Sequence, residues 1–338
     1  MSQGINLAVV GATSLVGEAI LEILEQKELP VETLTLLDSG ESVGKSLQFN
    51  EKSHRVESVG EFDFTEVQLA IFVAADDISE EYVQQAADQG CIVIDSSEVF
   101  RYEYDVPLIV SEVNSERIAE YSNRGIISTP SAASVPLLMA VAPIHRHASI
   151  KRINVATYQA VSESGKQGVE ELAGQTAKLL NGQTLETKTF AKQIAFNVLP
   201  QMGGLNENGY SYEEMSLVRD VQKVLGDEGV MVNPTCVQVP VFFGHGEAVH
   251  IECWDPVSAE EVKELFSYSS GINVVDGEEG YATAVTEAAK NHDVFISRIR
   301  EDISCENALD LWLVADNVKQ GTALNCVQIA EVLVNQYL

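Results

Sequence analysis

A glycine-framed segment near the start of the chain has the residue types that bind a phosphate. The segment Gly11-Ala12-Thr13-Ser14-Leu15-Val16-Gly17 follows an apolar run and opens an amphipathic pattern. Amide groups in the first turn of a helix face an anion, and glycine allows the backbone to approach it closely. The middle position is Ser14, whose Cβ and hydroxyl stand at the point of closest approach. The segment therefore predicts either a dinucleotide-binding turn or a turn of the same shape that binds nothing.

An acidic residue, Asp38, ends the next apolar run, 33–37. In a dinucleotide-binding unit, a carboxylate at this strand end accepts hydrogen bonds from the ribose 2′-hydroxyl and repels a 2′-phosphate. Asp38 therefore favours NAD over NADP if a dinucleotide binds. The alternative is a solvated loop carboxylate.

The composition excludes several classes of protein. The chain has 338 residues, enough for two domains. Its net charge of −30, from 21 basic and 51 acidic residues, argues against nucleic-acid or anionic-membrane partners. Five widely spaced cysteines without a CxxC pair indicate neither a disulfide framework nor a metal site. The start, Met1-Ser2-Gln3-Gly4, carries no secretory signal and no apolar run is long enough for a bilayer, so we expect a cytoplasmic protein.

The elements around these residues predict an α/β fold. In the first part, short apolar runs alternate with helical patterns, which is typical of a parallel sheet with crossover helices. We expect strands at 6–10, 33–37, 69–73, 92–94 and 126–128, with helices at 16–26 and 79–89.

The texture of the sequence changes after Pro130. We expect strands at 152–160, 237–243, 248–253 and 307–315, a turn at Gly244-His245-Gly246, and helices at 168–180 and 321–338. The coarse picture is a Rossmann-like dinucleotide-binding domain, 1–128, followed by a sheet-rich second domain, 129–319. The last segment, 320–338, is expected to pack back on the first domain.

Over its whole length the chain resembles the bacterial aspartate-semialdehyde dehydrogenases. The resemblance implies an N-terminal NAD(P)-binding Rossmann domain with NADP as the family's cofactor, an α+β domain for catalysis and dimerisation, and a homodimer. The matching segments are Gly11-Ala12-Thr13, Val93-Ile94-Asp95-Ser96-Ser97, Asp105-Val106-Pro107-Leu108, Glu112-Val113-Asn114, Thr157-Tyr158-Gln159-Ala160-Val161-Ser162, Gln193-Ile194-Ala195-Phe196-Asn197, Asn233-Pro234-Thr235-Cys236-Val237, Pro240-Val241-Phe242, Gly244-His245 and Ala315-Asp316-Asn317-Val318.

The catalytic roles of this family carry over to this chain only in part. In the family, a cysteine thiolate attacks the aldehyde, hydride passes to NADP, phosphate displaces the acyl group and a histidine moves protons. The family's Asn-Pro-Asn-Cys-Ser-Thr matches Thr129-Pro130-Ser131-Ala132-Ala133-Ser134, so Ala132 stands at the position of the lost nucleophile. The resemblance assigns the proton-transferring histidine to His245 and the glutamine beside the nucleophile to Gln159.

Several binding positions also depart from the family. The arginine that clamps the substrate carboxylate is Gln238, and of the phosphate-binding pair Arg101 remains while the lysine is Ser216. The arginine near the adenosine 2′-phosphate is Glu41, and the nicotinamide loop reads Ser162-Glu163-Ser164-Gly165. Together, the implied cofactor-binding residues are Gly11, Thr13, Ser14, Leu15, Val16, Gly17, Asp38, Glu41, Ser42, Ser162 and Asn317.

These departures predict a disabled enzyme. Alanine has no lone pair for a thiohemiacetal, and Ser131 or Ser134 would need an aligned base to replace it. Cys236 is expected to be a packing residue, and His245 a vestigial acid–base group.

We therefore expect a non-enzymatic, homodimeric binding or regulatory protein with an unidentified protein or small molecule as partner and without a bound dinucleotide. The alternative is an NAD(P)-dependent semialdehyde dehydrogenase, or another oxidoreductase of amino-acid biosynthesis, with an altered site. The expectation of a non-enzymatic protein without a bound dinucleotide rests on Ala132, Ser14 and Glu163.

Overall fold

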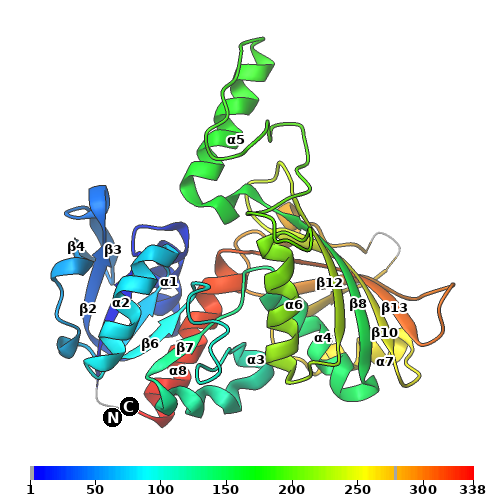
Figure 1. The fold of residues 1–338 in the computed structure, drawn as a ribbon, viewed down its shortest axis with the longest axis horizontal. Helices are drawn as coiled ribbons and strands as arrows, with labels where there is room; N and C mark the ends of the chain where they lie inside the picture. The colour runs from blue at the N-terminus through cyan, green and yellow to red at the C-terminus, as the bar shows by residue number, and fades with distance from the viewer. Residues whose placement is uncertain (1–3, 278–279) are drawn as a thin grey trace. The chain divides into compact units, whose positions relative to one another are not determined.

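The computed structural model describes residues 4–277 and 280–338, which form two compact units (Figure 1). The first unit is Met1–Pro130 with Thr322–Leu338, and the second is Ser131–Gly321. The expectation for the start of the sequence, residues 1–4, falls partly on residues 1–3, which lie outside the described residues. No helix among the described residues is long and apolar enough to cross a membrane.

The first unit is built on a seven-stranded sheet with the order β3-β4-β2-β1-β5-β6-β7. The pair β3–β4 at one edge is antiparallel, and the other pairs of this sheet are parallel. The parallel central strands agree with the expected Rossmann-type sheet. The central strands are buried almost throughout because helices cover both faces of such sheets. The strands are β1 (Ile5–Val10), β2 (Val31–Asp38), β3 (Ser46–Phe49), β4 (Lys52–Ser58), β5 (Leu69–Phe72), β6 (Ile92–Asp95) and β7 (Ile126–Ser128).

Crossover helices and the C-terminal helix complete this unit. The α-helices are α1 (Leu15–Lys27), α2 (Asp76–Asp88), α3 (Ser111–Asn114) and α8 (Asn325–Gln336), and short helical turns are η1 (Gly40–Ser42), η2 (Val59–Glu61), η3 (Phe64–Glu66) and η4 (Ser115–Asn123). Helix α8 packs against α1, α3 and β6. Lys27 and Glu331 form an ion pair of 2.7 Å between α1 and α8. The expected return of the C-terminal helix to the first domain is thus confirmed.

The second unit is built on a mixed six-stranded sheet with the order β11-β12-β13-β10-β8-β9. Pairs β10–β13, β8–β10 and β12–β13 are antiparallel, whereas β8–β9 and β11–β12 are parallel. The strands are β8 (Ile150–Gln159), β9 (Met231–Gln238), β10 (His245–Cys253), β11 (Ile272–Val275), β12 (Val294–Glu301) and β13 (Ala308–Ala315).

Helices cover one face of this sheet. Helices α4 (Ser134–Ala148), α6 (Tyr212–Leu225) and α7 (Ala259–Ser267) contact the strands, and α4 contacts both of the others. Helix α5 (Gly165–Leu180) follows the turn η5 (Val161–Ser164) and extends away from the sheet (Figure 1). Burial alternates along β8 because side chains alternate between the covered face and the open one. The remaining short helices are η6 (Ala284–Ala288) and η7 (Lys319–Leu324).

Two sequence-based element assignments in the second unit were wrong. The strand expected at 237–243 is instead β9, Met231–Gln238, which pairs with β8 through Gln238. The expected turn at residues 244–246 ends two residues early, because His245 already pairs with Ala315 as the first residue of β10. His245 is therefore held by a strand and not by a loop.

Candidate functional site

The glycine turn after β1 has a backbone that only glycine permits at two positions. Gly11 has φ of +79°, and a Cβ there would lie 2.5 Å from the carbonyl oxygen of Val73. A Cβ at Gly17 would lie 2.4 Å from the carbonyl oxygen of Gly11. These contacts fix helix α1 directly against the turn, which is the packing that a dinucleotide-binding turn uses.

Ser14 does not obstruct this turn. It is the N-cap of α1, and its Oγ accepts a hydrogen bond of 2.9 Å from the amide of Gly17. As the first residues of the helix, Leu15 and Val16 have amides without a carbonyl partner four residues earlier. The turn therefore fits a dinucleotide phosphate, which would meet these amides and the positive end of the helix dipole.

Asp38 is tied to the glycine turn and does not stand free in solvent. Its Oδ2 accepts hydrogen bonds from the amide of Thr13 at 3.1 Å and from its hydroxyl at 2.7 Å. The Thr13 hydroxyl also lies 2.8 Å from the hydroxyl of Ser42. Asp38, Thr13 and Ser42 thus come together at the end of β2, with exposed Glu41 in the adjoining turn η1.

Arg101, the basic residue expected to bind substrate, is buried in the first unit. Its Nη2 donates to the carbonyl of Ser96 at 2.8 Å, and its Nη1 lies 3.6 Å from the Glu98 carboxylate. These contacts hold the guanidinium in the loop after β6.

Ala132, the position of the lost nucleophile, is buried just before α4. The two nearby hydroxyls are paired with each other, since Ser131 Oγ lies 3.0 Å from Ser134 Oγ. The amide of Ser131 donates to the carboxylate of buried Asp220 at 2.9 Å. This arrangement anchors the N-terminus of α4, and among the described residues neither serine hydroxyl contacts a base.

His245 lies beside a carboxylate that the sequence placed in the nicotinamide loop. Its Nε2 is 3.5 Å from Oε2 of Glu163, and its side chain is 1% exposed. Burial lowers the pKa of His245 to about 3, so the ring is neutral at physiological pH. Asn317 joins the group, because its amide nitrogen donates to Glu163 at 3.3 Å and its amide oxygen accepts from Ser162 at 3.0 Å.

Gln159 and Gln238 are adjacent on β8 and β9 and are turned to different partners. The amide nitrogen of Gln159 donates to Thr157 Oγ1 at 3.1 Å and to Glu213 Oε1 at 3.3 Å. The amide nitrogen of Gln238 donates to the backbone carbonyl of Ala160 at 2.8 Å. Gln238 therefore offers no donor fixed for a substrate carboxylate.

A cavity and a buried serine lie near these strands. Gln238 lines a cavity of about 470 Å³ formed by Ser164, Thr189–Lys192 and Leu199–Gly203. Ser216 is buried in α6.

The sequence did not single out Glu247, which is buried on the same face of β10 as His245. Neither of its carboxylate oxygens has a hydrogen-bond partner among the described residues. Burial, and then the nearby Glu213 carboxylate, raise the pKa of Glu247 well above its usual value. The alternation of the strand could have identified it, because residues 245 and 247 point to one face.

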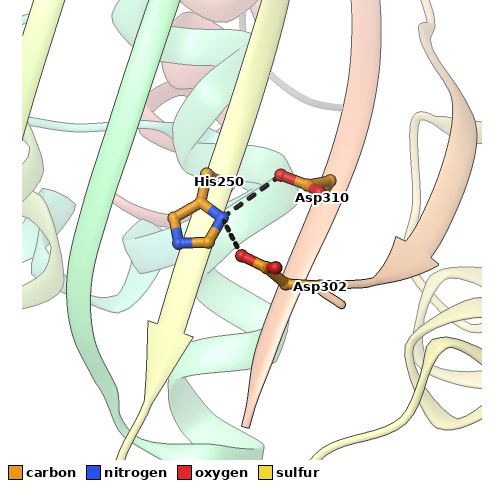
Figure 2. A group of neighbouring side chains, drawn as sticks. All are labelled: His250, Asp302 and Asp310. Atoms are coloured by element: carbon orange, nitrogen blue, oxygen red, sulfur yellow. Dashed lines mark hydrogen bonds and ion pairs between the residues drawn. The ribbon is translucent and has the colours of Figure 1, made fainter. Parts of the chain in front are cut away.

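One group on the open face of the sheet has the residue types of a metal site (Figure 2). His250 Nδ1 lies 3.2 Å from Asp310 Oδ1 and 3.3 Å from Asp302 Oδ2. Both carboxylates have further partners, since Asp310 pairs with Arg300 at 3.4 Å and Asp302 accepts from Ser304. Ion pairs and hydrogen bonds thus link the three side chains to one another and to Arg300 and Ser304.

Comparison with known proteins identifies the family. The family models "Semialdehyde dehydrogenase, NAD binding domain" and "Semialdehyde dehydrogenase, dimerisation domain" match residues 6–121 and 141–320. Aspartate-semialdehyde dehydrogenase 2 of Vibrio cholerae is 49% identical, with 100% of both chains covered. The chain belongs to the aspartate-semialdehyde dehydrogenase family.

Other members of the family are similar over the same length. Aspartate-semialdehyde dehydrogenase of Legionella pneumophila is 44% identical, covering 100% of this chain and 98% of its own. The solved structure of aspartate semialdehyde dehydrogenase II from Vibrio cholerae complexed with ASA has a TM-score of 0.98 at 49% identity, with 100% of both chains covered. The α/β fold, the NAD-binding domain and the dimerisation domain are thus those of the family.

These similarities overturn the expectation of a catalytically disabled, non-enzymatic binding or regulatory protein. Relatives at 44–49% identity over the full chain are named as dehydrogenases, so the chain is interpreted as an enzyme. Position 132 is nonetheless alanine, so no thiol is available there for a covalent intermediate.

Proposed function

We propose that this protein is an NAD(P)-dependent oxidoreductase that oxidises an amino-acid semialdehyde to the carboxylic acid without a thioester intermediate. The observation that carries the proposal is the 49% identity, over the whole chain, to a named aspartate-semialdehyde dehydrogenase. The buried His245, with its accessible carboxylate partner Glu163, supplies acid–base groups in the second unit.

The absence of a thiol at position 132 selects the chemical route. An aldehyde can be oxidised by hydride loss once water has added to its carbonyl, because the hydrate already carries both oxygens of the acid. The nicotinamide cofactor, when bound, supplies the hydride acceptor. Since Ala132 cannot form a thioester, there is no acyl group for phosphate to displace. The neutral Ser216 at the family's phosphate-binding lysine agrees with a reaction that uses no phosphate.

The cofactor is assigned to the glycine turn and its neighbours. We propose that Gly11, Thr13 and Gly17 shape the turn, and that the amides of Leu15 and Val16 bind the dinucleotide phosphate. The position of Ser14 as N-cap supports binding over the expected absence of a dinucleotide.

We further propose that NAD binds in preference to NADP. Asp38 and the exposed Glu41 place two carboxylates at the end of β2, where a 2′-phosphate would be repelled. Ser42 contributes its hydroxyl to the same corner, at 2.8 Å from Thr13.

In the second unit, we assign the reacting groups to the covered face of the sheet. His245 orients the carbonyl, Gln159 binds the polar end of the substrate, and Ser162 with Asn317 fixes the nicotinamide loop. Arg101, Gln238 and Ser216 stay as proposed substrate-side positions. The dimerisation domain supports a homodimer.

The test is an assay of purified protein with aspartate semialdehyde and either NAD or NADP, with and without phosphate. We expect reduced nicotinamide to accumulate equally with and without phosphate. Mass spectrometry should identify the product as the carboxylic acid. A His245→Gln variant purified in the same way controls for contaminating host enzyme. Turnover that requires phosphate and yields an acyl phosphate would refute the proposed route, and no turnover with either cofactor would refute the function.

A further inference from the structure

The buried ring of His245 faces a carboxylate that solvent and ligands can reach. Glu163 Oε2 lies 3.5 Å from His245 Nε2, and the side chain of Glu163 is 28% exposed whereas that of His245 is 1% exposed. Neither ring nitrogen has a hydrogen-bond partner among the described residues. A buried imidazole without such a partner is uncommon, and here it points to a group that completes its hydrogen bonds from the side of Glu163.

Asn317 fixes the position of that carboxylate. The amide oxygen of Asn317 accepts from Ser162 Oγ at 3.0 Å and from the amide of Gly244 at 3.2 Å. Two donors on the oxygen decide the orientation of the side-chain amide, so its nitrogen must face Glu163, to which it donates at 3.3 Å. Three segments of the chain, η5, the start of β10 and the residues after β13, thus hold one carboxylate beside one imidazole.

Other groups of the second unit are not suited to activating water. Ser131 and Ser134 are hydrogen-bonded to each other, and Cys236 is a fully buried thiol whose pKa burial raises. The carboxylate of Glu247 is fully buried, so neither solvent nor a ligand reaches it. Glu163 differs from these groups because it is a carboxylate both accessible and fixed next to an imidazole.

We propose that Glu163 is the general base that activates water in this enzyme, with His245 as the adjacent group that stabilises the oxygen formed from the aldehyde. The proposal rests on the proposed thioester-free oxidation. A water molecule gives a proton to the Glu163 carboxylate as its oxygen forms a bond to the aldehyde carbon. The carbonyl π electrons move to oxygen, which accepts a hydrogen bond from the neutral His245 ring and then the proton from Glu163.

The product of that step is the hydrate, with Glu163 again ionised. An oxidised nicotinamide cofactor, when bound, would supply the acceptor for the hydride of the hydrate carbon, and Glu163 takes the hydroxyl proton and passes it to solvent. Atoms and electrons balance as aldehyde, water and oxidised nicotinamide giving acid, reduced nicotinamide and a proton.

The kinetic test compares Glu163→Gln and Glu163→Ala with the wild-type enzyme, using Glu170→Gln of the following helix as a matched exposed control. We expect kcat to fall about 100-fold or more in both Glu163 variants, with KM changed less than about threefold, since a positioned base contributes 10²–10⁴-fold. Added formate or acetate should restore part of the activity of Glu163→Ala, because a small carboxylate can occupy the space left by the side chain. A merely structural role gives no such rescue. Unchanged kcat, or a loss without rescue, overturns the base assignment.

A second measurement needs neither substrate nor cofactor. The imidazole ¹⁵N resonances of His245, assigned by their loss in His245→Gln, should shift in Glu163→Gln and stay unchanged in Glu170→Gln. Lys166 lies three residues after Glu163 in the sequence and Glu247 lies two residues after His245, and their substitutions serve as further references. If the wild-type protein shows no turnover but the resonances shift, the proposed function and the base role of Glu163 are refuted, and the contact between Glu163 and His245 stands. Unshifted resonances overturn the pair itself.

Discussion

At the scale of single residues, the side chain at position 132 controls which intermediates can form. Its methyl group has no lone pair, and the flanking hydroxyls of Ser131 and Ser134 bond to each other at 3.0 Å. The remaining thiols of the chain do not compensate, because Cys91, Cys236, Cys253 and Cys326 are buried and burial raises the pKa of each. Nucleophilic chemistry by sulfur is therefore absent from the proposed reaction.

This view predicts how the native enzyme responds to alkylation. Under native conditions iodoacetamide should modify Cys305, the one half-buried cysteine, and leave the four buried thiols unmodified. The buried thiols should escape because thiolate fraction and access decide the rate of alkylation. Activity should stay within about twofold of the untreated enzyme, because the proposed reaction uses no thiol. Peptide mass spectrometry locates the label, and loss of activity on labelling of a buried cysteine would speak for a thiol in the mechanism.

Close packing at the glycine turn gives a second residue-scale prediction. Gly17→Ala should destabilise the first unit by about 1–3 kcal/mol, since the new Cβ meets the backbone of Gly11 at 2.4 Å and overpacking has costs of this size. Calorimetric titration should also show weaker NAD binding. Gly174→Ala in α5 is the control, because nothing lies within 4 Å of its added Cβ. That substitution should stabilise its helix by about 0.5–1 kcal/mol, and equal effects at the two positions would contradict the packing argument.

At the scale of elements, the parallel sheet was more predictable from sequence than the second unit. Strands β1 and β5 are short apolar runs, each followed by a helical pattern, so the alternation of strand and helix was visible. Helices α6 and α7 were missed although each begins with a capping box, Ser211 with Glu214 and Ser258 with Glu261. Those local signals define helix starts, but the polar composition of both segments concealed the buried face.

The candidate site divides in the same way. The glycine turn could be derived because its chemistry is local, within seven residues. The pairing of Glu163 with His245 could not, since it depends on strand register and on Asn317, which lies 154 residues beyond Glu163. Sequence reasoning counted Glu163 against a bound dinucleotide, whereas the structure places its carboxylate 3.5 Å from the His245 ring.

The buried Glu247 of β10 predicts a pH dependence of stability. Its pKa is raised in the folded unit, so the folded state keeps a proton that the unfolded state loses above about pH 4.3. The free energy of unfolding should therefore fall with rising pH by up to about 1.4 kcal/mol per pH unit until the folded-state pKa is reached. Glu247→Gln has no proton to lose, so the free energy of unfolding of the variant should not fall in this way. Its gain over the wild type should be smallest near pH 4 and larger at pH 8.

Tryptophan fluorescence is a suitable measurement for this variant, because Trp254 and Trp312 are the two tryptophans and both lie in the second unit. Urea unfolding is followed at several pH values, with Glu170→Gln as the exposed control. A stabilisation independent of pH would indicate improved packing in place of a relieved charge.

At the scale of the whole molecule, the open face of the second sheet is the surface that we expect to form the dimer interface. Tyr158 and Met231 are 39% and 50% exposed on β8 and β9, and the ring of Tyr158 packs on Trp312 at a centroid distance of 5.6 Å. Large apolar side chains on a sheet face without covering helices are typical of an interface. The sequence predicted the domain through family resemblance, whereas the identity of the face required the strand register.

We expect sedimentation to give a dimer of twice 36.8 kDa at micromolar concentration, with Tyr158→Glu shifting it to the monomer. In a two-fold dimer, each substituted residue appears on both sides of the interface, so two carboxylates enter it. Tyr104→Glu, at a 95% exposed position of the first unit, is the control and should stay dimeric. A monomeric wild-type protein, or a dimeric Tyr158→Glu variant, would contradict this assignment of the interface.

The net charge of −30 makes the same dimer dependent on salt. Two copies of like charge repel each other, and the repulsion reaches further at low ionic strength because the screening length grows from about 10 Å at 0.1 M to about 30 Å at 0.01 M. Burial of the apolar face is insensitive to salt in this range, so the balance between the two terms should move toward the monomer as salt is removed. Sedimentation velocity across that range should show the dissociation constant rising on dilution of the salt. A dissociation constant that falls under these conditions would mean that ion pairs between the subunits, and not their apolar faces, hold the dimer together.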